Sequence, residues 1–460
     1  MSTLGKKRGT RFVCASCGAV SPKWLGRCES CGEWNSMQPD SAPATRGAAA
    51  NVAPLHLTNM RDPIELPARQ PVGMDELDRV LGGGFVPGSV VLVGGDPGIG
   101  KSTLLLQAAA RMAMTGRRTI YVTGEESLHQ VKLRGQRLGV EQSGLDLAAN
   151  TDVREICAGI RGMEDIGLLV IDSIQTMRHD EIEGSAGSVS QVRGSAFELI
   201  SLAKERNLVL ILVGHVTKEG GLAGPRVLEH MVDVVLYFEG DRGHQFRILR
   251  AAKNRYGATA EIGVFEMTES GLHEVASPSA LFIAERRGEV AGSAVFAGVE
   301  GSRAMLLEVQ ALVLATGGTS PRRSVLGWDS GRLAMMLAVL ESRCGLKLGG
   351  ADVYLNIAGG MRVGEPAADL AIAAALTSAA TSRPTNPSAV YFGEIGLSGE
   401  IRQVPQVEKR LAEAAKLGFS RAVLPRRPEG RGFNGSAGTM KLTEIGHLSE
   451  LVDHFTGADG

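Results

Sequence analysis

Residues 90–113, VVLVGGDPGIGKSTLLLQAAARMA, decide the fold of this chain. They begin with a short apolar run, pass through a loop that matches G-x4-G-K-[ST] from Gly95 to Ser102, and end in an apolar helical stretch. A phosphate-binding loop requires this order of strand, loop and helix, because loop N–H groups and the positive end of the helix surround the phosphate. We therefore expect an α/β nucleotide-binding core.

The residue types in this loop predict the individual roles in ATP binding. Lys101 is expected to contact the β- and γ-phosphates, and the Ser102 hydroxyl is expected to ligate Mg²⁺. The predicted ATP-binding residues are Gly95, Asp96, Pro97, Gly98, Ile99, Gly100, Lys101, Ser102 and Thr103.

Three further apolar runs, 119–124, 168–173 and 208–214, have the pattern of parallel strands covered on both faces. Asp172 ends the second run, where a carboxylate can hold Mg²⁺, commonly through water. A helix N-cap or turn aspartate is the structural alternative. His215 closes the third run, where it either senses the γ-phosphate or has a structural role.

Two adjacent carboxylates, Glu125 and Glu126, follow the run at 119–124. A carboxylate at that position can orient and activate the attacking water, and the sequence does not separate the two. The segments 176–193 and 217–226 also follow strands on the carboxyl side, where ligands bind in open parallel sheets. They are either solvated loops or the lining of a nucleic-acid channel.

Residues 233–240 and 246–257 suggest a hairpin-like addition to the parallel sheet. The second of these segments ends in a compact basic motif, Lys253, Asn254, Arg255, Tyr256 and Gly257. By itself such a pentapeptide is either a solvated turn or a functional site.

Four cysteines near the start of the chain form two CxxC pairs separated by ten residues. They are Cys14, Cys17, Cys28 and Cys31. Four thiolates complete a closed tetrahedron, so this spacing predicts a structural zinc with no open position for a substrate. Gly18 and Gly32 follow the pairs where the backbone turns most tightly. We expect Trp24 and Trp34 to pack against the metal site, because so small a module has little other core.

Composition excludes several classes of protein. Of 460 residues, 43% are hydrophobic and 22% are charged, as in ordinary globular proteins. Acidic residues number 50 and basic residues 49, so any nucleic-acid site must be a local patch. No run reaches the roughly 18 apolar residues needed to span a membrane, and we recognise no secretory signal. We expect a cytoplasmic protein without a disulfide scaffold.

Changes in composition divide the chain into four segments. Residues 294–313 suggest paired strands, and 332–345, 366–380 and 406–418 suggest amphipathic helices. The predicted segments are a four-cysteine zinc finger at 1–35, a flexible Pro/Ala/Ser-rich linker at 36–60, an ATPase domain at 61–277 and a further domain at 278–460.

These residues together resemble the RadA (Sms) family of bacterial DNA repair and recombination proteins. The resemblance covers nearly the whole chain and rests on the zinc finger, the P-loop, the K-N-R-[FY]-G motif at 253–257 and the order of the modules. It implies a RecA-like ATPase core with a mainly parallel sheet and an α+β Lon-protease-like C-terminal domain. The catalytic residues implied are Lys101, Glu125, Glu126, Asp172, Lys253 and Arg255.

The resemblance also implies partners and an activity. We expect a hexameric ring that binds ATP between subunits, holds single-stranded or branched DNA in its centre and promotes branch migration with the RecA recombinase. Lys253 and Arg255 would then reach toward a neighbour's nucleotide or the DNA, where a cation in trans stabilises the transferring phosphoryl group. The cofactors expected are structural Zn²⁺ and Mg²⁺, with ATP as substrate.

The C-terminal resemblance predicts a domain without protease activity. Lon-type proteases carry a nucleophilic serine in a G-P-S-A-G segment, and residues 365–369 of this chain read EPAAD. Ala367 therefore stands where the nucleophile should be, and Glu408 stands where the dyad lysine is expected, with Lys409 beside it. Without a hydroxyl or thiol no acyl-enzyme forms. We expect a platform for assembly and DNA binding instead.

Basic residues of that domain are either scattered surface charges or a phosphate-contacting face. They are Arg322, Arg323, Arg343, Lys347 and Arg362.

Two other functions compete with a DNA-dependent ATPase. An ATP-dependent protease is disfavoured by Ala367. A nucleotide-gated scaffold or a RecA-fold kinase is the stronger alternative, since tandem glutamates such as Glu125 and Glu126 are also suggestive of a kinase. A kinase would transfer the γ-phosphate to protein, whereas a motor releases free phosphate.

Overall fold

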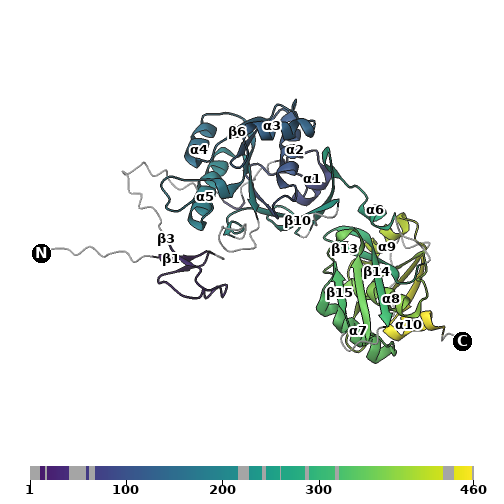
Figure 1. Ribbon diagram of the computed structural model, residues 1–460. Helices are drawn as coiled ribbons and strands as arrows, with labels where there is room; N and C mark the ends of the chain where they lie inside the picture. The colour runs from purple at the N-terminus through teal and green to yellow at the C-terminus, as the bar shows by residue number, and fades with distance from the viewer. Residues whose placement is uncertain are drawn as a thin grey trace. The chain divides into compact units, whose positions relative to one another are not determined.

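The computed structural model describes most of the chain (Figure 1). The described residues are 11–15, 18–40, 59–61, 68–215, 227–240, 245–259, 261–284, 290–315, 321–427 and 440–457. Their contacts divide the chain into two units. The first consists of Met1–Glu239 and Arg247–Glu274, and the second of Gly240–Phe246 and Val275–Gly460. No helix in the described part of the chain has the length and hydropathy needed to cross a membrane.

The cysteine-rich module is a three-stranded antiparallel sheet. Its strands are β1 (Arg11–Cys14), β2 (Val20–Ser21) and β3 (Met37–Asp40), in the order β2-β1-β3. The sequence placed Met37–Asp40 in the linker that begins at residue 36, but this segment pairs with all of β1. The pairing joins segments more than twenty residues apart, so local composition did not reveal it. Pro39 is compatible with it because β3 lies at an edge of this sheet.

The expectation that both tryptophans pack against the metal site is wrong. Trp24 is 54% exposed and Trp34 is 68% exposed, because Cys14, Cys28 and Met37 already fill the small core. Trp24 instead donates its Nε1–H to the carbonyl of Met37 at 3.1 Å. The Arg27 guanidinium lies 5.8 Å from the Trp34 ring centroid, within the range of a cation–π contact.

A nine-stranded sheet forms the centre of the first unit. Its strands are β4 (Val90–Gly95), β5 (Arg118–Thr123), β6 (Asp146–Ala149), β7 (Ile166–Asp172), β8 (Val209–His215), β9 (Val234–Glu239), β10 (Phe246–Asn254), β11 (Ile262–Thr268) and β12 (Gly271–Glu274). The order is β12-β11-β10-β9-β4-β8-β7-β5-β6, and the pairs from β9 to β6 are parallel. The mainly parallel α/β core is therefore confirmed.

The structure agrees only in part with the hairpin-like addition expected at residues 233–240 and 246–257. Strand β9 pairs antiparallel with β10, as a hairpin would, but its other edge pairs parallel with β4. The strand that leads into the P-loop consequently has a neighbour on both sides, β8 and β9.

Helices cover both faces of this sheet. On one face α1 (Asp75–Leu81) and α2 (Lys101–Met114) pack with Val91 and Val93 of β4. On the other face α4 (Val153–Arg161) and α5 (Val189–Arg206) pack with Val90 and Leu92. Figure 1 shows α4 beside α5. Successive side chains of a strand point to opposite faces, so coverage on both sides explains why these strands are continuously apolar. Helix α3 (Leu128–Arg137) contacts β6.

The polar segment expected at 176–193 is shorter in the structure. A 3₁₀ turn, η1 (Ile174–Thr176), precedes it, and Ser188 then caps α5, which begins at Val189. The Ser188 hydroxyl accepts the N–H of Gln191, as expected of an N-cap serine. The whole of the second segment, 217–226, lies outside the described residues.

The second unit is an α+β fold around a seven-stranded sheet with the order β15-β16-β14-β13-β17-β20-β21. Its strands are β13 (Ser293–Glu300), β14 (Arg303–Ala315), β15 (Arg323–Leu326), β16 (Ala351–Ile357), β17 (Ala389–Tyr391), β20 (Arg421–Pro425) and β21 (Lys441–Ile445), with a separate pair β18 (Glu394–Ile395) and β19 (Ile401–Arg402). Its helices are α6 (Pro278–Ala284), α7 (Ser330–Cys344), α8 (Asp369–Thr381), α9 (Val407–Lys416) and α10 (Leu448–Thr456), with 3₁₀ turns η3 (Ala358–Gly360) and η4 (Pro366–Ala368). The paired strands expected at 294–313 are β13 and β14, which are antiparallel.

Helix α8 is not amphipathic, contrary to expectation. Every residue from Asp369 to Ser378 is buried, because α8 packs against strands β13 and β14 and also against helices α7 and α10. Its many alanines allow close approach on all sides. Helix α9 does have one buried stripe, formed by Arg410, Leu411 and Ala414.

Candidate functional site

The P-loop connects the end of β4 to the start of α2. Gly100 is the N-cap of α2 with φ 114°, and a Cβ there would lie 2.6 Å from the Met267 methyl carbon. A Cβ at Gly95 would lie 2.4 Å from the carbonyl oxygen of Phe238. Only glycine fits at these two positions, so the loop can bring its backbone N–H groups close to a ligand.

Lys101 lies buried at the start of α2 with its ammonium inside the loop. Its Nζ donates to the carbonyl oxygens of Gly95 at 2.8 Å and Asp96 at 2.9 Å. Burial lowers the pKa of Lys101 to about 8, while the nearby carboxylates of Asp172 and Glu125 act in the opposite direction. The next residue, Ser102, lies in the first turn of α2 and is half-buried.

The other predicted ATP-binding residues follow the course of the loop. Asp96, Pro97 and Gly98 are exposed, Ile99 is buried, and Thr103 is half-buried in the first turn of α2.

Asp172 ends β7 and is held by a buried tyrosine of the adjacent strand. Strands β5 and β7 are parallel, with Thr123 opposite Asp172, and Tyr121 donates its hydroxyl hydrogen to the Asp172 carboxylate. Burial raises the pKa of Tyr121 well above its usual value, and the charge of Asp172 raises it further. The phenol therefore stays protonated and acts as a fixed donor to Asp172.

The structure separates the two adjacent glutamates. The Glu125 carboxylate lies 2.9 Å from Nε2 of His215 and accepts a hydrogen bond from the Ser173 hydroxyl. The hydrogen bond with His215 lowers the pKa of Glu125 to about 2, against the effect of burial, and Ser173 contributes to the decrease. Glu126 instead pairs with Arg134 of α3. Only Glu125 therefore joins the group formed by Lys101 and Asp172.

The motif at 253–257 lies at the other end of the same sheet. Asn254 pairs with Val234 of β9, and Val234 pairs with Val91 near the start of β4, whereas the P-loop follows the end of β4. Four strand positions at roughly 3.3 Å each separate the two ends. Lys253 and Arg255 therefore do not face the P-loop of their own chain.

Each polar side chain of this motif has a distinct environment. Lys253 donates from Nζ to the carbonyl oxygens of Glu229 at 2.7 Å and Val232 at 2.8 Å, and burial lowers its pKa. Asn254 is buried and donates to the carbonyls at the end of α1. The Arg255 guanidinium lies 3.3 Å from Asp233, although its side chain is 58% exposed. Asn254 therefore fixes the motif on the fold, while Arg255 is accessible from outside.

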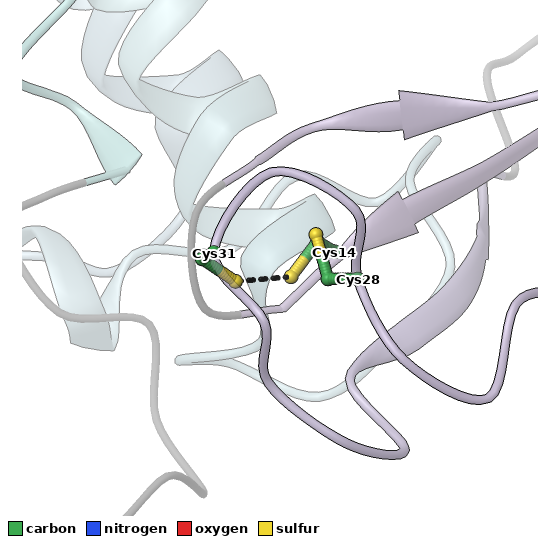
Figure 2. A group of neighbouring side chains, drawn as sticks. All are labelled: Cys14, Cys28 and Cys31. Atoms are coloured by element: carbon green, nitrogen blue, oxygen red, sulfur yellow. Dashed lines mark hydrogen bonds between the residues drawn. The ribbon is translucent and has the colours of Figure 1, made fainter.

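Three cysteine sulfurs of the antiparallel module come together, as Figure 2 shows. The Sγ atoms of Cys14, Cys28 and Cys31 lie within 4.8 Å of one another, and those of Cys14 and Cys31 are 3.6 Å apart. Tetrahedral zinc with Zn–S bonds of about 2.3 Å places its sulfurs roughly 3.8 Å apart, so the cluster fits zinc. Cys17, the fourth predicted ligand, lies outside the described residues.

The glycines that follow the two CxxC pairs have the expected backbone. Gly18 has φ 75° and Gly32 has φ 76°, which is the left-handed region that favours glycine.

An ion pair occupies the part of the second unit where the sequence suggested the remains of a protease dyad. Arg410 of α9 is fully buried and pairs with Glu365, and it also donates to the carbonyl of Ala297 at 2.7 Å. Ala367 is buried, whereas Glu408 and Lys409 are exposed. The basic residues suggested as a phosphate-contacting face are all exposed, namely Arg322, Arg323, Arg343, Lys347 and Arg362.

Known proteins resemble this chain both in segments and over its whole length. Residues 65–221 match the AAA domain family, 12–39 match the rubredoxin metal binding domain, and 336–428 match subunit ChlI of Mg-chelatase. DNA repair protein RadA of Brucella abortus is 51% identical over 457 residues, which cover 97% of each chain. The chain belongs to the RadA family.

Other RadA proteins show similar agreement. The protein from Bacillus subtilis is 48% identical, with 91% of this chain and 93% of the relative covered. The protein from Rickettsia felis is 49% identical, with 90% and 93% covered. Membership therefore rests on the full order of modules, as the resemblance seen in the sequence suggested.

Sequence reasoning missed three side chains that orient the carboxylates predicted for this RadA-family site. Tyr121, Ser173 and Arg134 orient Asp172, Glu125 and Glu126 respectively. Ser173 directly follows Asp172, so its position was a signal. Tyr121 is one of several large residues in a buried strand, and nothing local distinguished its hydroxyl from a packing group.

Proposed function

We propose that the chain is a DNA-dependent ATPase that acts in homologous recombination and DNA repair and promotes branch migration of recombination intermediates with RecA. The observation that carries this proposal is the arrangement of two charged clusters on one sheet. One contains Lys101, Asp172 and Glu125 at the P-loop end, and the other contains Lys253 and Arg255 at the opposite end.

The P-loop cluster suits binding and hydrolysis of ATP. Lys101 would exchange its two carbonyl partners for phosphate oxygens, and Ser102 and Asp172 would hold Mg²⁺, which neutralises charge on the β- and γ-phosphates. Glu125 has a pKa of about 2 and is a weak proton acceptor at neutral pH. Its role would be to orient the attacking water, with His215 and Ser173 fixing the carboxylate.

The second cluster suits catalysis in trans. Because Lys253 and Arg255 do not face their own P-loop, they would complete the nucleotide site of a neighbouring subunit or contact the DNA. In a closed hexameric ring, Lys253 and Arg255 of each subunit would lie at the nucleotide site of the next subunit. An exposed arginine supplied by a neighbour is a recurrent means of stabilising the transferring phosphoryl group.

The remaining modules would support this motor. Zinc at the four cysteines would be structural, and the second unit would be a Lon-protease-like domain that serves assembly and DNA binding without proteolysis. The buried Ala367 and the Arg410–Glu365 pair support that reading, since neither supplies a nucleophile. Casein cleavage that co-purifies with the protein through every column would contradict it. The cytoplasm is the compartment in which we place this activity.

The test is the steady-state ATPase rate with and without single-stranded DNA. We expect DNA to stimulate the wild type, and we expect Lys101→Ala and Lys253→Ala each to remove the stimulated rate. Mixing the two variants should restore part of it. A mixed ring contains interfaces that join an intact P-loop from one variant to an intact Lys253 from the other.

Three outcomes would contradict parts of the proposal. No recovery on mixing would contradict catalysis in trans. A rate indifferent to DNA would favour a nucleotide-gated scaffold. Transfer of radiolabelled γ-phosphate to protein instead of its release would favour a RecA-fold kinase, the alternative that the tandem Glu125 and Glu126 suggested.

A further inference from the structure

A cavity in the second unit lies between the sheet and α10. Its volume is about 290 Å³. Three adjacent parallel strands, β17, β20 and β21, line it with residues from one face, since Tyr391, Val423 and Thr443 lie side by side in register. Helix α10 closes the other side with Leu451 and Phe455. Much of the wall is therefore apolar or aromatic.

Two guanidinium groups lie at this cavity, and no carboxylate of the described residues neutralises them. Arg383 and Arg421 both line it, both are exposed, and neither has an ion-pair partner among the residues that the structure describes. The backbone at Arg383 is fixed, because its carbonyl accepts the Ser378 hydroxyl at 2.6 Å. Asn386 and His454 add polar groups to the lining.

The nearby acidic groups that the structure describes leave this charge uncompensated. On α10, Glu450 pairs with Arg426 at 2.6 Å, outside the cavity, and Asp453 is not part of the lining. Lys441 stands beside Arg421 in the strand register and adds further positive charge near the cavity. Among the described residues that line the cavity there is no carboxylate.

We propose that this cavity binds a nucleoside 5′-monophosphate group. Two guanidiniums without an ion-pair partner among the described residues match the charge of a phosphate, and the planar fork of arginine suits bidentate contact. Tyr391 and Phe455 line the cavity but are only 4% and 7% exposed, so they form part of an apolar wall that a base of any kind can contact at its edge. Asn386 and Thr443 can hydrogen-bond its polar edge.

The size of the cavity limits the ligand to one nucleotide. Ligand pockets usually measure roughly 300–1,000 Å³, so this cavity is at the small end of that range. Neither a folded peptide nor a dinucleotide fits inside it. The same chemistry exists in a free mononucleotide and in the 5′-phosphorylated end of a DNA strand, and the experiment distinguishes these two sources.

The test measures binding of dAMP to the full-length protein by titration calorimetry without Mg²⁺. We expect saturable binding that is weakened by about tenfold in Arg383→Gln and in Arg421→Gln, because each loses one charged phosphate contact. Arg402→Gln is the matched control, since Arg402 is an exposed arginine of the same unit outside the cavity lining. Binding should survive Lys101→Ala, which separates this cavity from the P-loop.

Oligonucleotides then identify the source of the phosphate. If the ligand is a DNA end, a 5′-phosphorylated single strand will displace dAMP better than its 5′-hydroxyl counterpart, and Arg421→Gln will remove that difference. If the two strands displace dAMP equally well, the ligand is a free mononucleotide and not a DNA end. Absence of dAMP binding, or equal binding in wild type, Arg383→Gln and Arg421→Gln, would overturn the proposal. DNA-stimulated ATP hydrolysis is measured separately, so failure here leaves it intact.

Discussion

At the scale of single residues, Glu125 and Glu126 differ in the hydrogen-bond and ion-pair partners of their carboxylates. We expect Glu125→Gln to lower kcat by about 100-fold or more, because an amide cannot orient and polarise the attacking water as a carboxylate does. Glu126→Gln should change kcat by less than about twofold, since it breaks only a partly exposed pair with Arg134. Single-turnover hydrolysis with ATP in both variants checks this. A larger loss in Glu126→Gln would reverse the assignment.

The pH dependence of ATP binding follows from Lys101. Its pKa in the free protein is about 8, so the ammonium loses its proton, and its attraction for phosphate, as pH rises through that value. We expect the Kd for ATP to increase by about tenfold between about pH 7 and about pH 9. Fluorescence titration with a labelled ATP analogue measures it. Lys101→Arg, which keeps its charge, should show a flat profile, and a wild-type Kd that falls with pH would contradict the prediction.

Burial of Lys101 also links pH to folding. The usual pKa of lysine is 10.5, so the unfolded chain holds this proton more tightly than the folded one. The contribution of Lys101 to the free energy of unfolding therefore becomes more favourable as pH rises from about 8 toward 10.5. ATP should reduce that change, because its phosphates stabilise the ammonium.

Tyr121 is a positioning residue for Asp172. Removing its hydroxyl in Tyr121→Phe leaves a buried carboxylate oxygen with one donor fewer. We expect the Mg²⁺ concentration for half-maximal ATPase to rise by about tenfold and the free energy of unfolding to fall by about 1 kcal/mol. Tyr237→Phe is the control, since Tyr237 lies in β9 of the same sheet and donates to Glu229, which precedes that strand. A loss of stability with an unchanged Mg²⁺ requirement would show a purely structural role.

At the scale of elements, the sequence predicts best where the deciding interactions are local. The strands at 90–95, 168–173 and 208–214 were recognisable because burial on both faces makes a strand continuously apolar. Helix α8 has no such one-sided pattern, since it is buried all round. Strand β3 depends on pairing with β1, which no local composition reveals. The same limit applies to the site, where the P-loop is local but the Tyr121–Asp172 contact joins two strands.

Helix α9 is tied to the second unit by the buried Arg410–Glu365 pair. Arg410→Met leaves Glu365 without its partner, so we expect the free energy of unfolding of this unit to fall by about 3–5 kcal/mol. The double variant Glu365→Leu/Arg410→Met removes both charges and should recover most of that loss. Urea unfolding followed by Trp328 fluorescence, with Trp24 and Trp34 replaced by Phe, measures it. If the double variant is no more stable than the single one, the carboxylate is not the source of the loss.

At the scale of the whole molecule, the positions of Lys253 and Arg255 in the fold limit the functions that the motif at 253–257 can have. Read along the sequence, the motif is a basic pentapeptide after a strand. In the fold, β9 and β10 bring it to the end of the sheet opposite the P-loop. The fold therefore separates these residues from the P-loop of their own chain, and this separation supports the proposed role on a neighbouring subunit.

Removing zinc from the zinc module shows whether this module and the ATPase core unfold separately. The module's core of Cys14, Cys28 and Met37 is a hydrophobic cluster of its own, distinct from the two that cover the nine-stranded sheet. We expect Cys28→Ser to abolish zinc binding, since structural sites need all four ligands, while the thermal transition of the ATPase core remains. Metal analysis and calorimetry of the same sample measure the zinc content and the thermal transition.

The control is Cys344→Ser, which removes a thiol from α7 and should leave zinc binding unchanged. The free energy of zinc binding stabilises every part of the chain that folds together with the metal site. Loss of the whole thermal transition in Cys28→Ser would therefore mean that the zinc module and the ATPase core fold as one unit.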